Sequence, residues 1–162
     1  MRQLLGRFKV VPLHLYRLQI GPRAQLREFE AQKKLGRDAY DLKLGDDGLV
    51  HPMKGPSFEG PNGMSLRPLG PAFGELIAGF RGRNTRIIPI PEGTVLPSEM
   101  VLLHEHSDHY SMQCDEPMSL PDLNNALTAF LDQFPFMTLQ EFKTQFPIDK
   151  LMVMDPSQPK KM

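Results

Sequence analysis

The chain lacks tryptophan, has a single cysteine and carries no excess of either charge, since 19 basic residues face 19 acidic ones. Cys114 alone can form neither an internal disulfide nor a cysteine-based zinc site, and such sparse cysteine makes a reducing compartment the expected environment. The zero net charge gives no electrostatic basis for binding nucleic acid or a membrane surface. No apolar run approaches the length of a membrane span. We therefore expect neither nucleic acid nor a membrane among the partners.

The length and the composition indicate one folded domain. The chain has 162 residues, of which 40% are hydrophobic and 8% aromatic, and this suffices for a single core. We expect one domain over residues 1–162, with a folded core from about residue 8 to residue 150 and a frayed tail over 151–162. Sixteen prolines and thirteen glycines indicate many turns and short strands rather than a helical bundle.

The N-terminal segment is basic. Residues 1–27 contain six basic side chains and no acidic one, as a mitochondrial presequence would. The segment has no serine, however, and residues 10–13 (Val-Val-Pro-Leu) are typical of the start of a strand. We therefore favour a folded first strand in a cytoplasmic protein and keep mitochondrial targeting as the minor alternative.

The first two thirds of the chain predict mainly strands and loops. β-branched and aromatic residues predict a strand over Phe8–Ile20, and good helix formers followed by Gly36 predict a helix over Ala24–Leu35. The further expected elements are a short helix over 73–80, a strand over 86–90, and two strand segments over 100–103 and 110–113. Those two segments fit either one long strand or a hairpin.

The last third predicts two helices. Ser119, with proline early and Asp122 three positions on, is typical of a helix start, and apolar residues from Leu120 to Phe134 then fall on one helical face. Thr138 and Glu141 have the spacing of a capping box for a second helix that Pro147 ends. Strands early and helices late predict the α+β class.

Residues 104–109 read His-Glu-His-Ser-Asp-His, which is the spacing of a two-metal hydrolase site. Such a site needs more histidines later in the chain, and none follows His109. No glycine follows Gly93, so the small-residue turn expected after the motif is missing too. We therefore predict exposed histidines at a strand edge and turn, without a metal centre, and keep a metal-dependent hydrolase as a third alternative.

Three groups of residues resemble one toxin family in order and spacing. They are Leu15-Tyr16-Arg17, the segment from Asp47-Gly48-Leu49 to Asn62-Gly63-Met64-Ser65-Leu66, and the segment from Ile88-Pro89-Ile90-Pro91-Glu92-Gly93-Thr94 to His109-Tyr110-Ser111-Met112. The chain resembles, over roughly residues 13–135, the second exported effector of a bacterial type VI secretion system. That family is classed as ADP-ribosyltransferase-like and also has fungal relatives.

The resemblance implies a compact α+β fold with small antiparallel or mixed sheets and flanking helices, similar to ADP-ribosylating toxins. It implies an NAD site in a cleft between two small sheets, with NAD as substrate of a transferase or glycohydrolase. It also implies toxicity in the cytoplasm of a target cell, and bacterial members are silenced by an immunity protein, so such a protein is a candidate partner here.

The resemblance also assigns site residues. It places Arg17 on a phosphate or ribose of NAD, and a planar multi-donor cation suits that role. Gly63 and Ser65, with Met64 between them, fall where the nicotinamide end approaches the backbone. His109 falls where a side chain orients the nucleophile or the ribose hydroxyls.

Other assignments stay open. Tyr16 or Tyr110 could stack on the nicotinamide ring. Ser57 competes with Ser65, because the loop between them is hard to register.

One departure from the pattern bears on the chemistry. Transferases of this type usually place a catalytic glutamate on a late strand, and the resemblance assigns none here. Glu105 and Glu116 lie near the expected region without matching a motif. A catalytically silent module that keeps the fold and binds a protein is therefore the alternative function.

Overall fold

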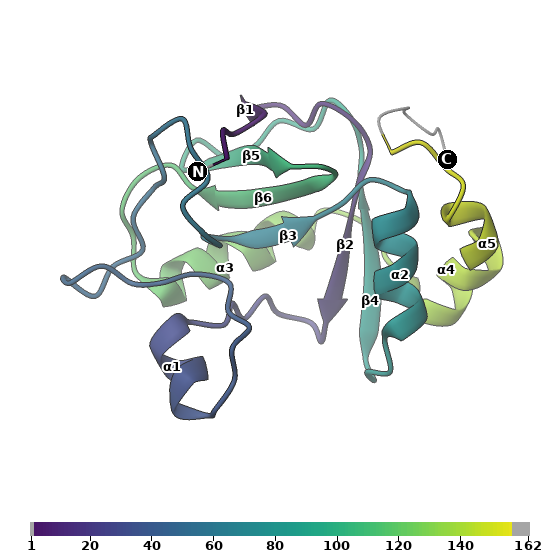
Figure 1. Ribbon diagram of the computed structural model, residues 1–162, viewed down its shortest axis with the longest axis horizontal. Coiled ribbons are helices and arrows are strands. Elements are labelled where there is room, and N and C mark those ends of the chain that lie inside the picture. Colours follow the sequence, from purple (N-terminus) through teal and green to yellow (C-terminus); the bar gives the residue numbers. More distant parts are fainter. Residues whose placement is uncertain (1, 157–162) are drawn as a thin grey trace.

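The computed structural model describes residues 2–156, which form two small sheets with helices around them (Figure 1). A four-stranded sheet has the order β1 (Gly6–Phe8), β5 (Met100–His106), β6 (His109–Cys114) and β3 (Met64–Leu66). A three-stranded sheet has the order β2 (Leu15–Ile20), β4 (Thr85–Ile90) and β7 (Met137–Thr138). All of these strand pairs are antiparallel.

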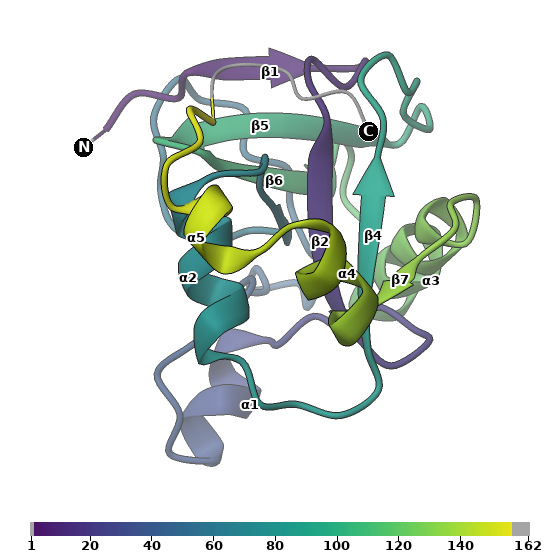
Figure 2. The same cartoon turned by 90° about the vertical axis from the view of Figure 1, so that its right-hand side faces the viewer.

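Helices pack around the three-stranded sheet. Its outer face carries α2 (Pro71–Gly79), α4 (Leu139–Gln145) and α5 (Ile148–Leu151). In Figure 2, α4 lies in front of β2, and α2 and α5 lie to the left of that strand. A helix on the other side, α3 (Leu120–Leu131), packs into the apolar core that the two sheets share. The short helix α1 (Phe29–Lys34) lies apart, beside the loop that leads to β3 (Figure 1).

The side chains of β2 alternate between two separate hydrophobic cores. Leu15 belongs to the core between the sheets, together with Met64 and Met112 of the four-stranded sheet. Tyr16 points the other way, into a second core with Phe73 and Phe142. Successive side chains of a strand lie on opposite faces, so each face of this sheet is covered and β2 is held from both sides.

The α+β class and the small antiparallel sheets are confirmed, but the first predicted strand divides in two. Phe8 ends β1 and Leu15 begins β2, so the chain passes from one sheet to the other between them. Pro12 lies between the two strands. It has no backbone N–H to donate, and at this position no β-sheet hydrogen bond requires one.

The predicted helix over 24–35 begins only at Phe29, with Glu28 as its N-cap. Backbone N–H groups before it are bound by side chains of α3. Ala24 N–H donates to Thr128 Oγ1 at 2.9 Å, and Leu26 N–H donates to Asn124 Oδ1 at 3.0 Å. These tertiary hydrogen bonds hold the segment extended against its local helix propensity.

The two strand segments around the histidines form a hairpin. Ser107 and Asp108 connect β5 to β6, and Ser107 adopts a positive φ of 46°. The pairing skips a residue between His104 and His106, which is a β-bulge. Because of the bulge, His109 pairs with His106 rather than with Glu105.

Both predicted helix caps are present. Ser119 Oγ accepts from the Asp122 N–H at 3.2 Å, and Thr138 and Glu141 form a capping box. The expected tail is shorter than 151–162, because Leu151 is fully buried in α5 against α2. Residues 157–162 lie outside the described part of the chain.

Within the described residues, no helix has both the length and the apolar character that crossing a bilayer requires.

Candidate functional site

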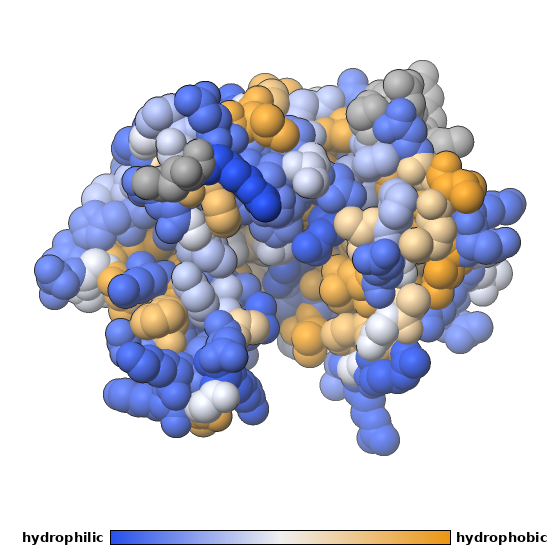
Figure 3. Space-filling model, viewed as in Figure 1, coloured by the Kyte–Doolittle hydropathy of each residue, from blue (hydrophilic) through white to orange (hydrophobic). Residues whose placement is uncertain are grey.

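A cleft of about 540 Å³ opens where β2 and β3 separate. The two strands are joined by backbone hydrogen bonds between Tyr16 and Arg67, at 2.7 and 3.1 Å, and β2 has no further pairing on this edge within the described chain. The cleft is lined by residues of β2, β3, α2 and the loops near α1: Tyr16, Arg17, Leu18, Gln19, Ile20, Gln25, Arg27, Asp41, Ser65, Arg67, Phe73, Leu76 and Phe80. In the space-filling view this face is hollowed between the α1 side and the α2 side, with apolar residues gathered on the α2 side (Figure 3).

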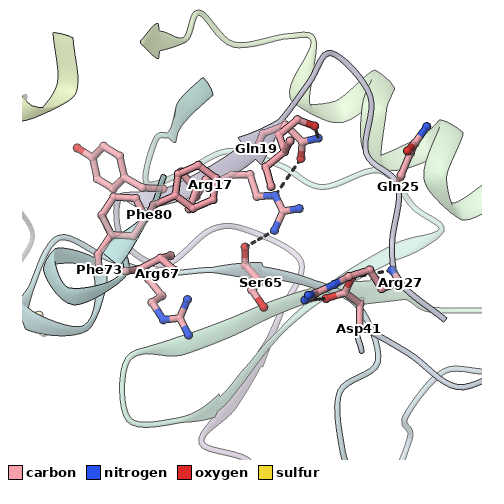
Figure 4. A pocket seen from close by; sticks show the side chains of 13 residues that line it. Arg17, Gln19, Gln25, Arg27, Asp41, Ser65, Arg67, Phe73 and Phe80 are labelled. Carbon is pink, nitrogen blue, oxygen red and sulfur yellow. Dashed lines mark hydrogen bonds and ion pairs between the residues drawn. The ribbon is translucent and has the colours of Figure 1, made fainter. Parts of the chain in front are cut away.

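Arg17 extends across the gap between the two strands. Its Nη1 donates to the carbonyl oxygen of Ser65 at 3.2 Å, and its Nε donates to Gln19 Oε1 at 3.0 Å. Burial lowers the pKa of Arg17 to about 10, so the guanidinium stays charged at neutral pH. The nearest acidic residue of the cleft, Asp41, is bound by both nitrogens of the Arg27 fork at 3.0 and 3.1 Å. Arg17 therefore keeps N–H donors for a ligand (Figure 4).

A second guanidinium, that of Arg67, enters the same cleft. Arg67 follows Ser65 by two positions, which puts both side chains on one face of the β3 strand. Burial lowers the pKa of Arg67, and the charge of Asp108 partly opposes that shift. With Arg17 and Arg67 together, the cleft suits an anionic ligand such as a diphosphate.

Ser65 lines the cleft, and it contacts His109, which is not one of the lining residues. His109 Nε2 lies 3.0 Å from Ser65 Oγ, and His109 Nδ1 lies 2.7 Å from Glu105 Oε1. Glu105 is only 1% exposed. The structure thus brings together the three predicted catalytic residues, and it adds a carboxylate behind the imidazole.

Strand β6 separates this polar group from the apolar core. Its residues Tyr110, Met112 and Cys114 belong to the core between the sheets. Ser111 and Gln113, which alternate with them, bond each other, since Gln113 Nε2 donates to Ser111 Oγ at 3.1 Å. Because successive side chains of a strand point to opposite faces, β6 has one face in the apolar core and one face of hydrogen-bonded polar side chains.

The four predicted cofactor-binding residues occupy supporting positions. A β-carbon on Gly63 would collide with the carbonyl oxygen of Met112, so this glycine allows β3 to approach β6. Met64 is fully buried in the core and points away from Ser65. Neither residue lines the cleft.

The two tyrosines are engaged by other rings. Tyr16 lines the cleft but is 1% exposed, and its ring packs on Phe73 and Phe142 at centroid distances of 5.9 and 6.0 Å. Its hydroxyl is buried and has no hydrogen-bond partner among the residues that the structure describes, and burial raises its pKa to about 12. Tyr110 stacks on His104 at 4.0 Å. Ser57, the competitor of Ser65, pairs with Gln3 in an isolated bridge outside the cleft lining.

Part of the histidine-rich hexad forms a group that could hold a cation. Donor atoms of Glu105, His106 and His109 lie within 4.8 Å of one another. His104 is not in this group, because its Nε2 is 2.6 Å from the carbonyl oxygen of Ser107. The prediction of exposed histidines is wrong, since all three are half-buried. Burial lowers the pKa of His106, as does the nearby His109.

Three charged residues of the cleft lining were missed by the sequence interpretation. Arg67 could have been found, because it shares a strand face with Ser65. Asp41 and Arg27 could not, since their ion pair depends on how the loop around α1 folds back. No local pattern reveals that contact.

A sequence model of the protein family described as Tse2 ADP-ribosyltransferase toxin matches residues 13–142. The match includes both sheets except β1, and it includes Arg17, Ser65 and His109. No curated protein and no solved structure matches the chain. Because the family match covers most of the sequence, the resemblance of the sequence motifs is confirmed, and this chain belongs to the Tse2 ADP-ribosyltransferase toxin family.

Proposed function

We propose that the cleft binds NAD and that the protein is a cytotoxic enzyme that uses NAD as its substrate. This proposal rests on the position of Arg17 and Arg67, whose side chains are both half-buried, beside the Ser65–His109 pair. The diphosphate of NAD would lie between the guanidiniums, where charge-assisted hydrogen bonds are strong because solvent is partly excluded.

The nicotinamide end of NAD would lie beside Ser65 and against the apolar wall. We place the ring on Phe80, which is half-buried at the cleft, rather than on Tyr16, whose ring is covered by other aromatic side chains. Stacking on an aromatic face suits a planar cationic ring. This arrangement puts the ribose carbon that bears nicotinamide next to Ser65 and His109.

The chemistry would break the bond between ribose and nicotinamide, with the bonding electrons leaving on nicotinamide. An acceptor hydroxyl, amine or water would then bond the ribose carbon, and its proton would pass to His109 Nε2, directly or through Ser65. A general base at this position contributes typically 100-fold to 10,000-fold, as an order of magnitude. Arg17 would hold the substrate in place rather than exchange a proton.

The family also suggests where the protein acts and what opposes it. We propose that it acts in the cytoplasm of a target cell and that a dedicated immunity protein can bind it. Both statements rest on the family alone.

A catalytically silent module is the second candidate. It is favoured by the burial of Glu105, which at 1% exposure cannot touch a ribose in the cleft as a catalytic glutamate would. A silent module would bind a protein partner and leave NAD unchanged.

One experiment separates the two candidates. Calorimetry with NAD and an assay of nicotinamide release are run on the wild type, on Arg17→Lys and on Ser65→Ala. We expect wild-type turnover, a loss of NAD affinity of about 10-fold to 100-fold in Arg17→Lys because lysine lacks the planar fork, and a loss of turnover in Ser65→Ala. Arg83→Lys, at an exposed arginine outside the cleft, is the matched control and should behave as wild type. Absence of both binding heat and nicotinamide release in the wild type would refute the enzyme.

A further inference from the structure

We propose that Glu105 is a positioning residue, which fixes the tautomer of His109 so that its Nε2 can accept the proton of the Ser65 hydroxyl. The proposal rests on the proposed function for its catalytic meaning, but its structural core can be tested without NAD. Glu105 lines no part of the cleft and is 1% exposed, so it acts through His109.

The starting point is a backbone carbonyl that fixes which way a buried hydrogen-bond chain runs. Asn62 Nδ2 donates to the carbonyl oxygen of His51 at 3.0 Å. A carbonyl oxygen can only accept, so the Asn62 amide must present its NH₂ group here. The same Nδ2 lies 3.2 Å from Gln113 Oε1, which makes that oxygen the acceptor.

The orientation of Gln113 then fixes the rest of the chain. With its oxygen on Asn62, Gln113 presents Nε2, which donates to Glu105 Oε2 at 3.2 Å. The other carboxylate oxygen lies 2.7 Å from His109 Nδ1. An ionised carboxylate accepts only, so the hydrogen of a neutral His109 lies on Nδ1.

The last link reaches the cleft. With Nδ1 protonated, His109 Nε2 carries a lone pair, and it lies 3.0 Å from Ser65 Oγ. The Ser65 hydroxyl is then the donor. Each group along this chain of hydrogen bonds, from the His51 carbonyl to Ser65, therefore has a fixed role as donor or acceptor. The buried Glu105 carboxylate thus determines that the Ser65 hydroxyl donates to His109.

The variant Glu105→Gln reverses the direction of the last two hydrogen bonds, between position 105 and His109 and between His109 and Ser65. Gln113 still presents its NH₂ group, so the amide introduced at position 105 turns its oxygen toward Gln113 and its nitrogen toward His109. His109 Nδ1 must then accept, which moves the hydrogen to Nε2. The Ser65 hydroxyl loses its acceptor and becomes one itself.

The double variant Glu105→Gln with Gln113→Glu restores the original direction. A carboxylate at position 113 accepts from Asn62, from the Ser111 hydroxyl and from the amide at position 105. That amide then turns its oxygen toward His109 Nδ1. The tautomer returns, while the negative charge lies one side chain further away.

The test is the tautomer of His109, measured by ¹⁵N–¹H NMR of the neutral imidazole in the wild type and both variants, with thermal melting to confirm folding. We expect the Nδ1–H form in the wild type, the Nε2–H form in Glu105→Gln and the Nδ1–H form again in the double variant. An Nε2–H wild type, or a Glu105→Gln that keeps the Nδ1–H form, would overturn the proposal, and the wild-type spectrum decides even where a variant does not fold.

The kinetic readout is separate. Glu105→Gln should lower kcat for NAD by about 100-fold to 10,000-fold with KM unchanged, because His109 Nε2 then carries a hydrogen and cannot act as the general base, and the double variant should recover most of that loss. A changed KM with an unchanged kcat would contradict the assignment. If the wild type turns over no NAD, the proposed function fails, while the NMR result still decides the role of Glu105.

Discussion

Arg17 on β2 donates a hydrogen bond from Nη1 to the carbonyl oxygen of Ser65 on β3, at 3.2 Å. This bond joins the two sheets where their strands have already separated, next to the bridge between Tyr16 and Arg67. One guanidinium therefore both closes the inner end of the cleft and faces its contents. The predictions below concern this cleft and the packing that supports it.

Arg67→Met should weaken NAD binding by about 10-fold, because it removes one charge-assisted contact to the diphosphate and keeps only the unbranched apolar stem of the side chain. Titration calorimetry at two salt concentrations checks this. The control Arg83→Met should leave the affinity unchanged, since Arg83 lies outside the cleft lining. Equal affinities of Arg67→Met and the wild type would place the diphosphate elsewhere.

Gly63→Ala should destabilise the fold by about 3 kcal/mol, within the upper range for overpacked sites, because its β-carbon would collide with the Met112 carbonyl oxygen. Urea unfolding followed by circular dichroism measures this. Gly79→Ala is the matched control, since a β-carbon at that helical position meets nothing within 4 Å. The control should be neutral or stabilising by up to about 1 kcal/mol.

Tyr16→Phe should leave stability unchanged or raise it by about 1 kcal/mol, because the buried hydroxyl has no hydrogen-bond partner to lose within residues 2–156. Thermal unfolding of the two proteins provides the comparison. Marked destabilisation would show that the hydroxyl is bonded in solution, for instance to a water molecule.

Cys114 should resist alkylation at about pH 8 in the folded protein, because the thiol is buried and burial raises its pKa to about 11. Mass spectrometry after iodoacetamide treatment, with and without urea, tests this. Modification in urea alone is expected. Equal rates in both conditions would mean that the hairpin opens readily.

Asp115 gives the fold a pH dependence. Hydrogen bonds from Lys54 and Lys9 lower its pKa below the ordinary value of 3.8. A group whose folded pKa is depressed contributes stability above its unfolded pKa and loses it as the pH falls through the folded pKa. Asp115→Asn should therefore cost below about 1 kcal/mol at neutral pH, as exposed ion pairs do.

That difference in unfolding free energy should shrink as the pH is lowered from about 5 toward about 2, where the wild-type carboxyl is protonated as well. Urea unfolding at a series of pH values measures it. Asp38→Asn, at an exposed carboxyl, serves as the control and should show no such trend. A difference that persists at low pH would mean that Asp115 acts through packing.

Local sequence signals predicted several features of the local structure. The caps at Ser119 and Thr138 were readable because capping involves residues three positions apart. Arg17, Ser65 and His109 were assigned by resemblance, and the structure brings them together.

The remaining features depend on tertiary contacts. The start of α1 is set by hydrogen bonds from α3, and the role of Glu105 depends on its contact with His109 across the hairpin. The bulge in β5 pairs His109 with His106, a pairing that regular alternation would not have predicted. The glutamate that no motif assigned was thus found only by its contact with His109.

The side chains of β6 alternate between the apolar core and the polar group next to the cleft, so both depend on the register of the hairpin. A shift of β6 by one position against its neighbouring strands would place Met112 among the hydrogen-bonded polar side chains and Gln113 in the apolar core. The packing of the core and the hydrogen bonds to Glu105 would then both be lost. Any insertion or deletion within the strand has the same effect. Under the proposed function, point substitutions at Glu105, Ser65 or Arg17 are expected to lower the activity while leaving the register of the hairpin unchanged.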